Sequence, residues 1–351
     1  MPQDPLAIVQ RRLHAQRLAS GHFEQPAEAV QWLGAMQAQE YAEAKWSIGE
    51  RVDGCTDAEV EEAFARGDIL RTHVLRPTWH FVTPADIRWM LQLTAPRVHA
   101  ANRYSYRKYE LPSETLERSH DIIAAALEGG EPLTRPELAE ALAQAGIVAD
   151  GLRLGYILMH AELEALICSG PRRGKQHTYA RFESRVPESP ELAREEALAE
   201  LALRFFRSRR PATIRDFSAW SGLTMADAKA GREMVADRLD SDADDGRAAP
   251  GAFLIPMYDE LGISYKDLRM VLARQPPREG MLSRPIVIDG LTVGSWKRTV
   301  TRRAAVIEAA LFTDLSGAEA AALDAVVERF GRFMELPASV IKVSVEHGPR
   351  G

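Results

Sequence analysis

Two glutamines, Gln37 and Gln39, stand one residue apart in the stretch LGAMQAQEYAEAKW, where an apolar helical pattern ends. On an α-helix, residues i and i+2 point about 200° apart, so the two amides could not act on one target. In an extended or irregular segment they share a face, because side chains alternate with a period of about 2. Two amides on one face can orient a water molecule and turn the negative ends of their dipoles toward a developing cation. The alternative is that the pair is an accident of a polar surface.

Other reactive patterns are missing from the sequence. It contains no HExxH, CxxC, Walker A or GxGxxG motif. The histidines of the first predicted hairpin and the following helix have no spacing typical of metal ligands. The segment HAELE (160–164) alternates along a predicted helix, so we do not expect its side chains to converge. We therefore expect no metal and no cofactor.

The composition is that of a soluble globular protein. The chain has 351 residues, which allows two or three domains, with 46% hydrophobic and 27% charged residues. No apolar run reaches the roughly 18 residues that a membrane span requires, and the N-terminus lacks the layout of a signal peptide. The two cysteines, Cys55 and Cys168, lie far apart and predict neither a disulfide framework nor a zinc site. We expect a cytoplasmic monomer.

The net charge of −6 and the pI near 5.9 argue against a nucleic-acid partner, but the positive charges are clustered. The clusters are GPRRGK (Arg172, Arg173, Lys175), RFFRSRR (Arg204, Arg207, Arg209, Arg210) and WKRTVTRR (Lys297, Arg298, Arg302, Arg303). One cluster alone is most simply a solvated surface patch. Three clusters at loop or hairpin positions weaken that interpretation without excluding it.

The middle of the chain has the clearest pattern. The spacing of apolar residues predicts helices over 113–130, 131–146 and 150–170, and then a basic hairpin over 166–182. Thr134 and Glu137 form a capping-box pattern at the start of the second helix, and Gly146 is a stop signal at its end. Three helices followed by a hairpin is the order of a winged helix, with the helix-turn-helix element between the last two helices.

This pattern recurs along the chain. Residues 191–239 predict three helices, with Thr213 and Thr224 as caps and Gly222 in the turn. The N-terminal part predicts three helices, over 5–20, 26–37 and 56–67, and then a hairpin over 69–83. The C-terminal part is rich in β-prone runs, with a hairpin turn at Asp289–Gly290 and one helix. We predict an α+β fold, mainly α, with three tandem winged helices and a C-terminal β-rich domain. The expected boundaries are 1–110, 111–186, 187–250 and 251–351.

Four short segments, MQAQ, LRPTWHFV, LIPMYDELGISYKD and RPIVIDGLTVGSWKR, occur in this order along the chain. Together they resemble the AlkZ/YcaQ-type bacterial DNA glycosylases, which unhook interstrand crosslinks and remove bulky N7-alkylguanines. The resemblance spans essentially the whole chain and implies tandem winged helices in a C-shaped arrangement with a C-terminal β-barrel. Gln37-Ala38-Gln39 matches the Gln-x-Gln element of the AlkZ-like branch. The sequence departs from the family at Leu268, where an arginine is expected, which puts a local salt bridge or phosphate contact in doubt.

The resemblance implies a monofunctional DNA glycosylase that acts on cationic N7-alkylguanine lesions in double-stranded DNA, and hence a nucleoid-associated enzyme. Gln37 and Gln39 are then the catalytic residues. His80 and Asp259, in matching family segments, are candidate pocket residues, and Asp259 has a structural cap as its alternative role. The candidate DNA-binding residues are Arg71, Arg76, Arg172, Arg173, Lys175, Lys297 and Arg298.

Two alternatives remain open on the sequence. A non-enzymatic winged-helix DNA-binding protein, such as a regulator, could use Gln37 and Gln39 merely to contact the DNA backbone. A scaffold that has lost DNA binding would agree with the acidic pI. The sequence does not decide which adduct is preferred or whether crosslinks are processed.

Overall fold

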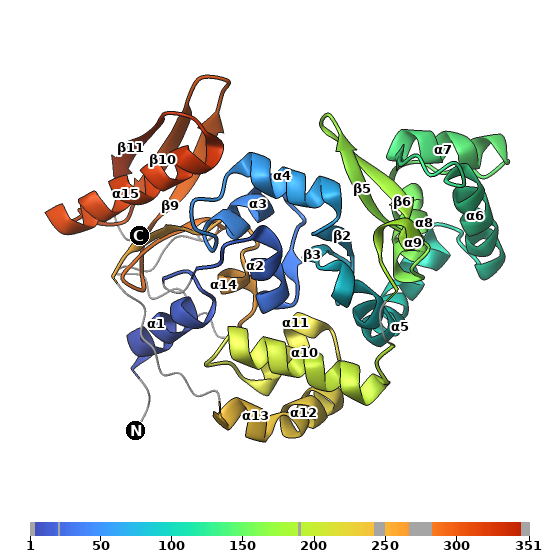
Figure 1. Cartoon of the computed structure of the whole chain (residues 1–351), viewed down its shortest axis with the longest axis horizontal. Coiled ribbons are helices and arrows are strands. Elements are labelled where there is room, and N and C mark those ends of the chain that lie inside the picture. Colours follow the sequence, from blue (N-terminus) through green and yellow to red (C-terminus); the bar gives the residue numbers. More distant parts are fainter. Residues whose placement is uncertain (1–3, 20–21, 189–190, 242–249, 267–282, 345–351) are drawn as a thin grey trace, which may run out of the picture.

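The computed structural model describes residues 4–19, 22–188, 191–241, 250–266 and 283–344. It is a mixed α and β structure in which helices predominate (Figure 1). Leu268, where the sequence departs from the family pattern, lies outside the described residues. None of the described helices is both long and apolar enough to cross a membrane.

The N-terminal unit holds the two glutamines. Its elements are α2 (Pro26–Leu33), β1 (Met36–Gln37), α3 (Tyr41–Gly49), α4 (Asp57–Arg66), β2 (Leu70–His73) and β3 (Trp79–Val82). The three strands form an antiparallel sheet in the order β1-β3-β2. The helix α3 was not among the helices expected from the sequence, and it lies directly after the segment that carries the glutamines.

The second unit repeats this plan after the long helix α5 (Pro84–Lys108). Its elements are α6 (Ser113–Ala126), β4 (Leu133–Thr134), α7 (Arg135–Gln144), α8 (Gly151–Leu163), β5 (Ile167–Arg173) and β6 (Gln176–Arg181). The sheet order is β4-β6-β5, so the order of elements and the strand order are both those of the first unit. The predicted capping box is present, because Thr134 Oγ1 accepts from Glu137 N and the Glu137 carboxylate accepts from Thr134 N.

A helical unit follows. It consists of α9 (Phe182–Arg185), α10 (Arg194–Ser208), α11 (Ile214–Ser221), α12 (Met225–Met234) and α13 (Ala236–Ser241). Thr213 and Thr224 cap α11 and α12, and Gly222 (φ 71°) makes the left-handed turn between them, as expected. Residues 191–241 contain helices and no strand, in agreement with the three helices predicted for residues 191–239.

The C-terminal part is a five-stranded sheet with one long helix. Its elements are β7 (Ala252–Leu254), α14 (Glu260–Ile263), β8 (Pro285–Ile288), β9 (Leu291–Val300), β10 (Ala305–Leu311), α15 (Gly317–Met334) and β11 (Ala338–Ser344). The sheet order is β11-β10-β9-β8-β7, and only β10 and β11, which α15 connects, are parallel. Asp289 and Gly290 make the predicted turn between β8 and β9, both with positive φ. The strands that the structure describes form an open sheet with β7 and β11 at its edges, so the expected barrel is not closed here.

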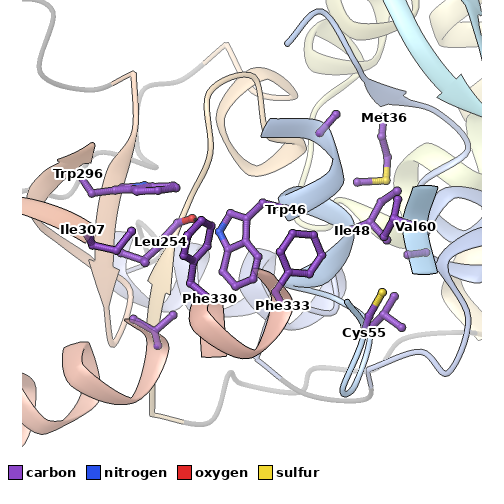
Figure 2. Close-up of a cluster of buried hydrophobic side chains, with 14 of the residues drawn as sticks. Met36, Trp46, Ile48, Cys55, Val60, Leu254, Trp296, Ile307, Phe330 and Phe333 are labelled. Carbon is purple, nitrogen blue, oxygen red and sulfur yellow. The ribbon is translucent and has the colours of Figure 1, made fainter. Parts of the chain in front are cut away.

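The first unit and the C-terminal sheet share one hydrophobic core. Figure 2 shows Trp46 of α3 in its middle, with Phe330 and Phe333 of α15 against it. The ring centroids of Trp46 and Phe330 are 5.0 Å apart in an edge-to-face arrangement, and Trp46 Nε1 donates to Leu254 O at 2.9 Å. Met36, which precedes the first glutamine, is buried in the same core. The C-terminal sheet therefore anchors the glutamine segment.

The first helix belongs to this C-terminal part as well. α1 (Pro5–Ala15) was expected to open the first winged helix, but it packs Val9 and Leu13 against Phe253, Leu261 and Val287. The first helix of the N-terminal unit is therefore α2. It precedes α3, α4 and the strands β2 and β3 of the small sheet.

A second core joins the N-terminal hairpin to the helices of residues 194–239. It includes Leu70 of β2, Met90 of α5, Phe205 of α10 and Trp220 of α11. Figure 1 accordingly shows the N-terminal unit in the middle, with the C-terminal sheet and the second unit on opposite sides and α10–α13 below.

Candidate active site

Gln37 and Gln39 lie in the non-helical segment that connects α2 to α3. α2 ends at Gly34, whose φ of 77° lies in the left-handed region that favours glycine. Met36 and Gln37 then form β1, and the chain stays non-helical until α3 begins at Tyr41. Both glutamines are half-buried, and Ala38 between them is buried. The segment thus has the backbone that the one-residue spacing requires if the two amides are to act together.

Contacts from three distant segments hold this backbone in place. Gln37 N donates to Glu260 Oε1 at 2.9 Å, and Ala38 N donates to Trp79 O at 2.7 Å. Ala38 O accepts from Arg71 Nε at 2.9 Å. The backbone on both sides of the Gln37–Ala38 peptide is therefore fixed before any ligand binds.

The buried ion pair of Arg209 and Glu260 also supports this segment. Arg209 donates to Leu33 O at 2.8 Å, to Ala35 O at 3.3 Å and to Glu260 Oε2 at 2.7 Å. Arg209 and Glu260 are both fully buried, and Trp220 Nε1 also donates to Glu260, at 2.8 Å. Burial alone would raise the pKa of Glu260. The charge and hydrogen bonds of Arg209, with the hydrogen bond from Gln37 N, outweigh burial and lower that pKa below its ordinary value.

The amide of Gln37 has a fixed orientation. Arg76 Nη2 donates to Gln37 Oε1 at 3.0 Å. Because a guanidinium group only donates hydrogen bonds, the oxygen end of the amide must face Arg76. That oxygen has a second lone pair, which Arg76 leaves available.

His80 faces Gln37 across the sheet, because the two residues are paired in the β1–β3 register. His80 Nδ1 lies 2.9 Å from Thr78 O, and Nε2 lies 3.5 Å from Arg76 Nη2. Burial, and then the charge of Arg76, lower the pKa of His80 well below its ordinary value. A neutral imidazole therefore lies beside the Gln37 amide, with Nδ1–H donating to Thr78 O and Nε2 as an acceptor.

Gln39 is held less tightly than Gln37. Within the described part of the chain, no hydrogen bond engages its side-chain amide, although the residue is half-buried. One amide of the pair is therefore preset and the other is available to a ligand.

Asp259 does not face an open pocket. Both of its carboxylate oxygens bond to the buried Arg51, at 2.8 and 3.0 Å, and one also accepts from Leu261 N at 2.8 Å, which caps α14. Ser47 donates to the other oxygen. These contacts favour the structural role considered for Asp259 over the pocket role.

The position of Arg71 does not suit the contact with a DNA phosphate that was expected for it. It is buried, its guanidinium group stacks on the Trp79 ring at 4.3 Å, and its Nε binds Ala38 O. Burial lowers its pKa, although nearby acids counteract the effect. In this position Arg71 supports the glutamine segment.

The hairpin β5–β6 carries the first basic cluster. Lys175 is exposed, and Arg173 is exposed while paired with Glu137 at 2.7 Å. Arg172 pairs with Glu61 of α4 at 3.1 Å. This hairpin tip is thus partly available to phosphates and partly docked on the first unit.

The hairpin β9–β10 also carries both exposed and paired basic residues. Lys297, Arg302 and Arg303 are exposed, whereas Arg298 pairs with Glu43 of α3 at 3.1 Å.

The cluster RFFRSRR, in contrast, is only in part a surface patch. Arg209 is fully buried, and Arg204 is half-buried in ion pairs with acids of α5 and α10.

A surface cavity of about 610 Å³ lies between α2, α5 and α10. Its charged lining consists of three acids, Asp86, Glu196 and Glu200, and two arginines, Arg204 and Arg238, and it includes neither catalytic candidate. Three carboxylates disfavour a polyanion, so we place the functional site at the glutamine segment and not in this cavity.

Sequence reasoning missed Arg209 and Glu260, the buried pair beneath the glutamines. Glu260 stands next to the nominated Asp259, and Arg209 lies in a cluster that was interpreted as surface charge. The available signal was the aromatic context of Arg209, after Phe205 and Phe206, because a surface arginine seldom follows a strongly apolar helix face.

Comparisons with known proteins concern the family and the fold of the chain. A family model described as "DNA glycosylase AlkZ-like" matches residues 30–333. The solved structure of the DNA glycosylase AlkZ from Streptomyces sahachiroi is similar in fold, with a TM-score of 0.73 and 19% sequence identity. The match covers 97% of this chain and 100% of that chain. A search of curated proteins gave no match.

Proposed function

The chain belongs to the AlkZ-like DNA glycosylase family, and on this premise we propose that it hydrolyses the N-glycosidic bond of cationic N7-alkylguanine lesions in double-stranded DNA. The observation that carries the proposal is the set of hydrogen bonds that fixes the Gln37–Ala38 backbone, with the Gln37 amide oriented by Arg76 and the Gln39 amide engaged by no described residue.

The chemistry suits a pair of neutral amides. A glycosidic bond breaks through an oxocarbenium-like sugar, with the base as the leaving group. An unmodified guanine needs protonation to leave, whereas an N7-alkylated guanine already carries a positive charge. The protein then needs only to orient a water molecule and to turn negative dipole ends toward the sugar. Preorganised dipoles of this kind supply about 2.7–4 kcal/mol each.

The two glutamines have different roles in this mechanism. Gln37 Oε1, with one lone pair on Arg76, uses the other to hold the attacking water. Gln39, whose amide no described residue engages, turns its oxygen toward the sugar when the lesion binds. Neither amide can act as a general base, so the site cannot excise a base that leaves without a positive charge.

The reaction is hydrolysis without a covalent intermediate. Lys45 of α3 is the lysine nearest in sequence to the glutamines. Its ammonium group is bound to Asp57 at 2.7 Å and to Glu61 at 2.9 Å. A lysine engaged by two carboxylates is a poor candidate for a Schiff-base nucleophile.

The surrounding architecture suits a lesion that cannot be flipped out freely, such as an interstrand crosslink or a bulky intercalating adduct. We interpret the N-terminal unit, the second unit and α10–α12 as three winged helices that enclose the duplex in a C-shaped arrangement. The exposed Lys175, at the tip of the β5–β6 hairpin, and the exposed Lys297, within β9, supply phosphate contacts, and the glutamine segment approaches the lesion from the middle.

The test is excision from an oligonucleotide duplex that contains one N7-alkylguanine, followed by mild alkali to break the strand at abasic sites. We expect strand breaks at the lesion, and none in matched duplexes with guanine or uracil at that position. A duplex crosslinked through N7 of two guanines tests unhooking, which separates the strands on a denaturing gel. Lesion binding without abasic sites, under excess enzyme, would instead identify a DNA-binding protein that has lost the reaction.

A further inference from the structure

Three imidazole rings meet at the junction of α5, α6 and α8, outside the glutamine site. They belong to His99 of α5, His120 of α6 and His160 of α8. The ring centroids of His99 and His160 are 4.5 Å apart, and those of His120 and His160 are 4.9 Å apart. Glu164, at the C-terminal end of α8, completes the group.

The donor atoms of three of these residues are gathered closely. His99, His160 and Glu164 each offer one ligand atom, and the three atoms all lie within 4.8 Å of one another. Ligands at about 2.1 Å from a tetrahedral metal ion lie about 3.4 Å apart, so small side-chain rotations would complete such a geometry. The sequence analysis expected no convergence in the segment HAELE. His160 and Glu164, however, are four residues apart and share one helix face.

One of these atoms lacks a hydrogen bond. His99 Nε2 lies 2.9 Å from Glu164 Oε1, but it is buried and, among the described residues, has no hydrogen-bond partner of acceptable geometry. The nitrogen and the carboxylate oxygen are close without being directed along a hydrogen bond. This is the arrangement of two groups that face a third point.

The remaining ring nitrogens already have partners. His99 Nδ1 lies 2.9 Å from the Tyr106 hydroxyl, and His160 Nδ1 lies 3.1 Å from His120 Nε2. In metal sites a ligating imidazole almost always donates its other N–H to a neighbouring acceptor, which fixes its tautomer. Tyr106 and His120 can accept these two hydrogen bonds and leave Nε2 of His99 and of His160 free to ligate.

We propose that His99, His160 and Glu164 form a binding site for a divalent transition metal ion, with Zn²⁺ as the best match. Two imidazoles and a carboxylate are a common zinc ligand set, and three protein ligands leave the fourth position to water. Glu164 is half exposed, with 51% of its side chain accessible, so water and the ion can reach the site. Mg²⁺ and Ca²⁺ prefer oxygen ligands and should bind poorly.

The bound ion would join α5 to α8 directly and α6 through His120. These helices carry the hairpin β5–β6, whose tip contacts α4 through Arg172. A metal at this junction would therefore stiffen the second unit, and it would raise the stability of the folded protein by RT ln(1 + [metal]/Kd). The site takes no part in the reaction at Gln37 and Gln39.

The test is metal binding by the full chain after dialysis against EDTA. We expect one equivalent of Co²⁺ to give the visible absorption of a tetrahedral site and Zn²⁺ to displace it. Zn²⁺ should also raise the melting temperature, whereas Mg²⁺ should not. Absence of Co²⁺ absorption together with an unchanged melting temperature in Zn²⁺ would overturn the proposal.

Variants assign the ligands. Glu164→Gln, at a half-exposed position, should fold normally by circular dichroism and bind Zn²⁺ at least about tenfold more weakly. His160→Ala should abolish the Co²⁺ absorption, and His120→Asn should weaken binding about 10- to 100-fold. His22→Ala is the matched control, since His22 pairs with Asp53 elsewhere. If Glu164→Gln and His160→Ala bind Zn²⁺ as tightly as the control, the ion binds elsewhere and the assignment is wrong.

Discussion

Gln37 and Gln39 differ in how they are restrained, and this difference has kinetic consequences. The Gln37 amide is fixed by Arg76 before DNA binds, whereas the Gln39 amide is unengaged in the part of the chain that the structure describes. A preset dipole costs no reorganisation when charge develops in the transition state, whereas an unrestrained one must be ordered first. Gln37 therefore acts through preorganisation, and Gln39 depends on the bound lesion for its orientation.

Replacing either glutamine by alanine should lower the rate and leave binding nearly unchanged. An interaction made mainly in the transition state affects excision and not the ground-state affinity. A loss of about 2.7–4 kcal/mol corresponds to a slowing of roughly two to three orders of magnitude. Gln39→Asp should retain substantial activity, because a carboxylate oxygen carries more negative charge than an amide oxygen. Single-turnover excision, with lesion-DNA affinity measured in parallel, tests this, and wild-type rates in both alanine variants would exclude the catalytic role.

Arg76 should act through Gln37, as a positioning residue. Arg76→Ala should slow excision by freeing the Gln37 amide, since Gln37 Oε1 accepts from Arg76 Nη2. In a Gln37→Ala background the same change should cost little further rate. The measurement is a double-mutant cycle on single-turnover rates, which isolates the coupling between the two side chains. Additive effects would mean that Arg76 acts independently, for example on a phosphate.

The buried histidines predict a loss of stability in acid. Burial lowers the pKa of His80 well below its ordinary value and lowers that of His177 to about 4, with nearby arginines adding to both effects. The unfolded chain therefore binds protons that the folded chain does not, once the pH falls below about 6.5. Stability is fully present above that pH and declines below it, by up to about 1.4 kcal/mol per pH unit for each fully buried histidine.

Urea unfolding between pH 7.5 and 5.5 measures this decline. His80→Gln should give a shallower decline than the wild type, because it removes one proton-binding group from the unfolded state. His177→Gln should have a smaller effect of the same sign, since its ring is more accessible to solvent than that of His80. An unchanged slope in His80→Gln would show that His80 binds protons equally in the folded and the unfolded protein, which would contradict its lowered pKa.

At the scale of elements, local signals in the sequence were sufficient for caps and turns. The capping box at Thr134, the helix caps at Thr213 and Thr224 and the turn at Asp289–Gly290 are as predicted. Each depends on a side chain and a backbone group within three residues, or on the φ preference of a glycine. Such interactions can be inferred from a short stretch of sequence.

Long-range contacts could not be inferred in the same way. Arg209 and Leu33 are 176 residues apart in the sequence, and Glu260 and Gln37 are 223 apart. The sequence of α1 predicts an ordinary amphipathic helix, but it does not indicate which hydrophobic core this helix joins. The glutamine pair could be predicted from its spacing and the family resemblance, whereas the side chains that hold it could not.

The pair Arg209–Glu260 should be necessary for the segment between α2 and α3. Glu260→Ala leaves a buried arginine without its partner, which should cost about 3–5 kcal/mol of unfolding free energy. Glu260→Gln keeps one acceptor oxygen, which can serve Trp220 Nε1 or Gln37 N but not both, and should cost less than Glu260→Ala. Glu62→Gln is the control, because its pair with Arg66 is exposed and should be worth less than about 1 kcal/mol. Urea unfolding measures all three, and equal effects of Glu260→Ala and Glu62→Gln would contradict the role of the pair.

At the scale of the whole molecule, the N-terminal unit is central because two cores meet there. One core joins it to the C-terminal sheet, and the other joins its hairpin to α5 and α10–α12. The expected boundaries at 110, 186 and 250 therefore describe chain segments, while the hydrophobic packing crosses them. The glutamine segment lies between the two cores, because Met36 belongs to the first and Ala35 to the second. Rigid positioning of the glutamines thus depends on the C-terminal part and on α10 and α11 as well as on the N-terminal unit.

The exposed lysines of the two basic hairpins, Lys175 and Lys297, should determine how DNA binding depends on salt. Removing one side chain that binds a phosphate reduces the slope of log K against log[salt] by about one unit for duplex DNA. We expect this reduction for Lys175→Ala and for Lys297→Ala, with equal weakening for all sequences. Arg172 and Arg298 should contribute less, because each must first leave a glutamate, Glu61 or Glu43.

Binding isotherms at several salt concentrations, on duplexes of different sequence, test this expectation. Arg194→Ala is the control, because Arg194 lies on α10 and pairs with Asp227 at 2.7 Å, away from both hairpins. Its slope should equal that of the wild type. The slope of the double variant Lys175→Ala/Lys297→Ala should fall by about two units if one duplex binds both hairpins at once. If that slope falls by no more than in one single variant, the two hairpins do not bind the same duplex, and the enclosing arrangement of the three units would have to be abandoned.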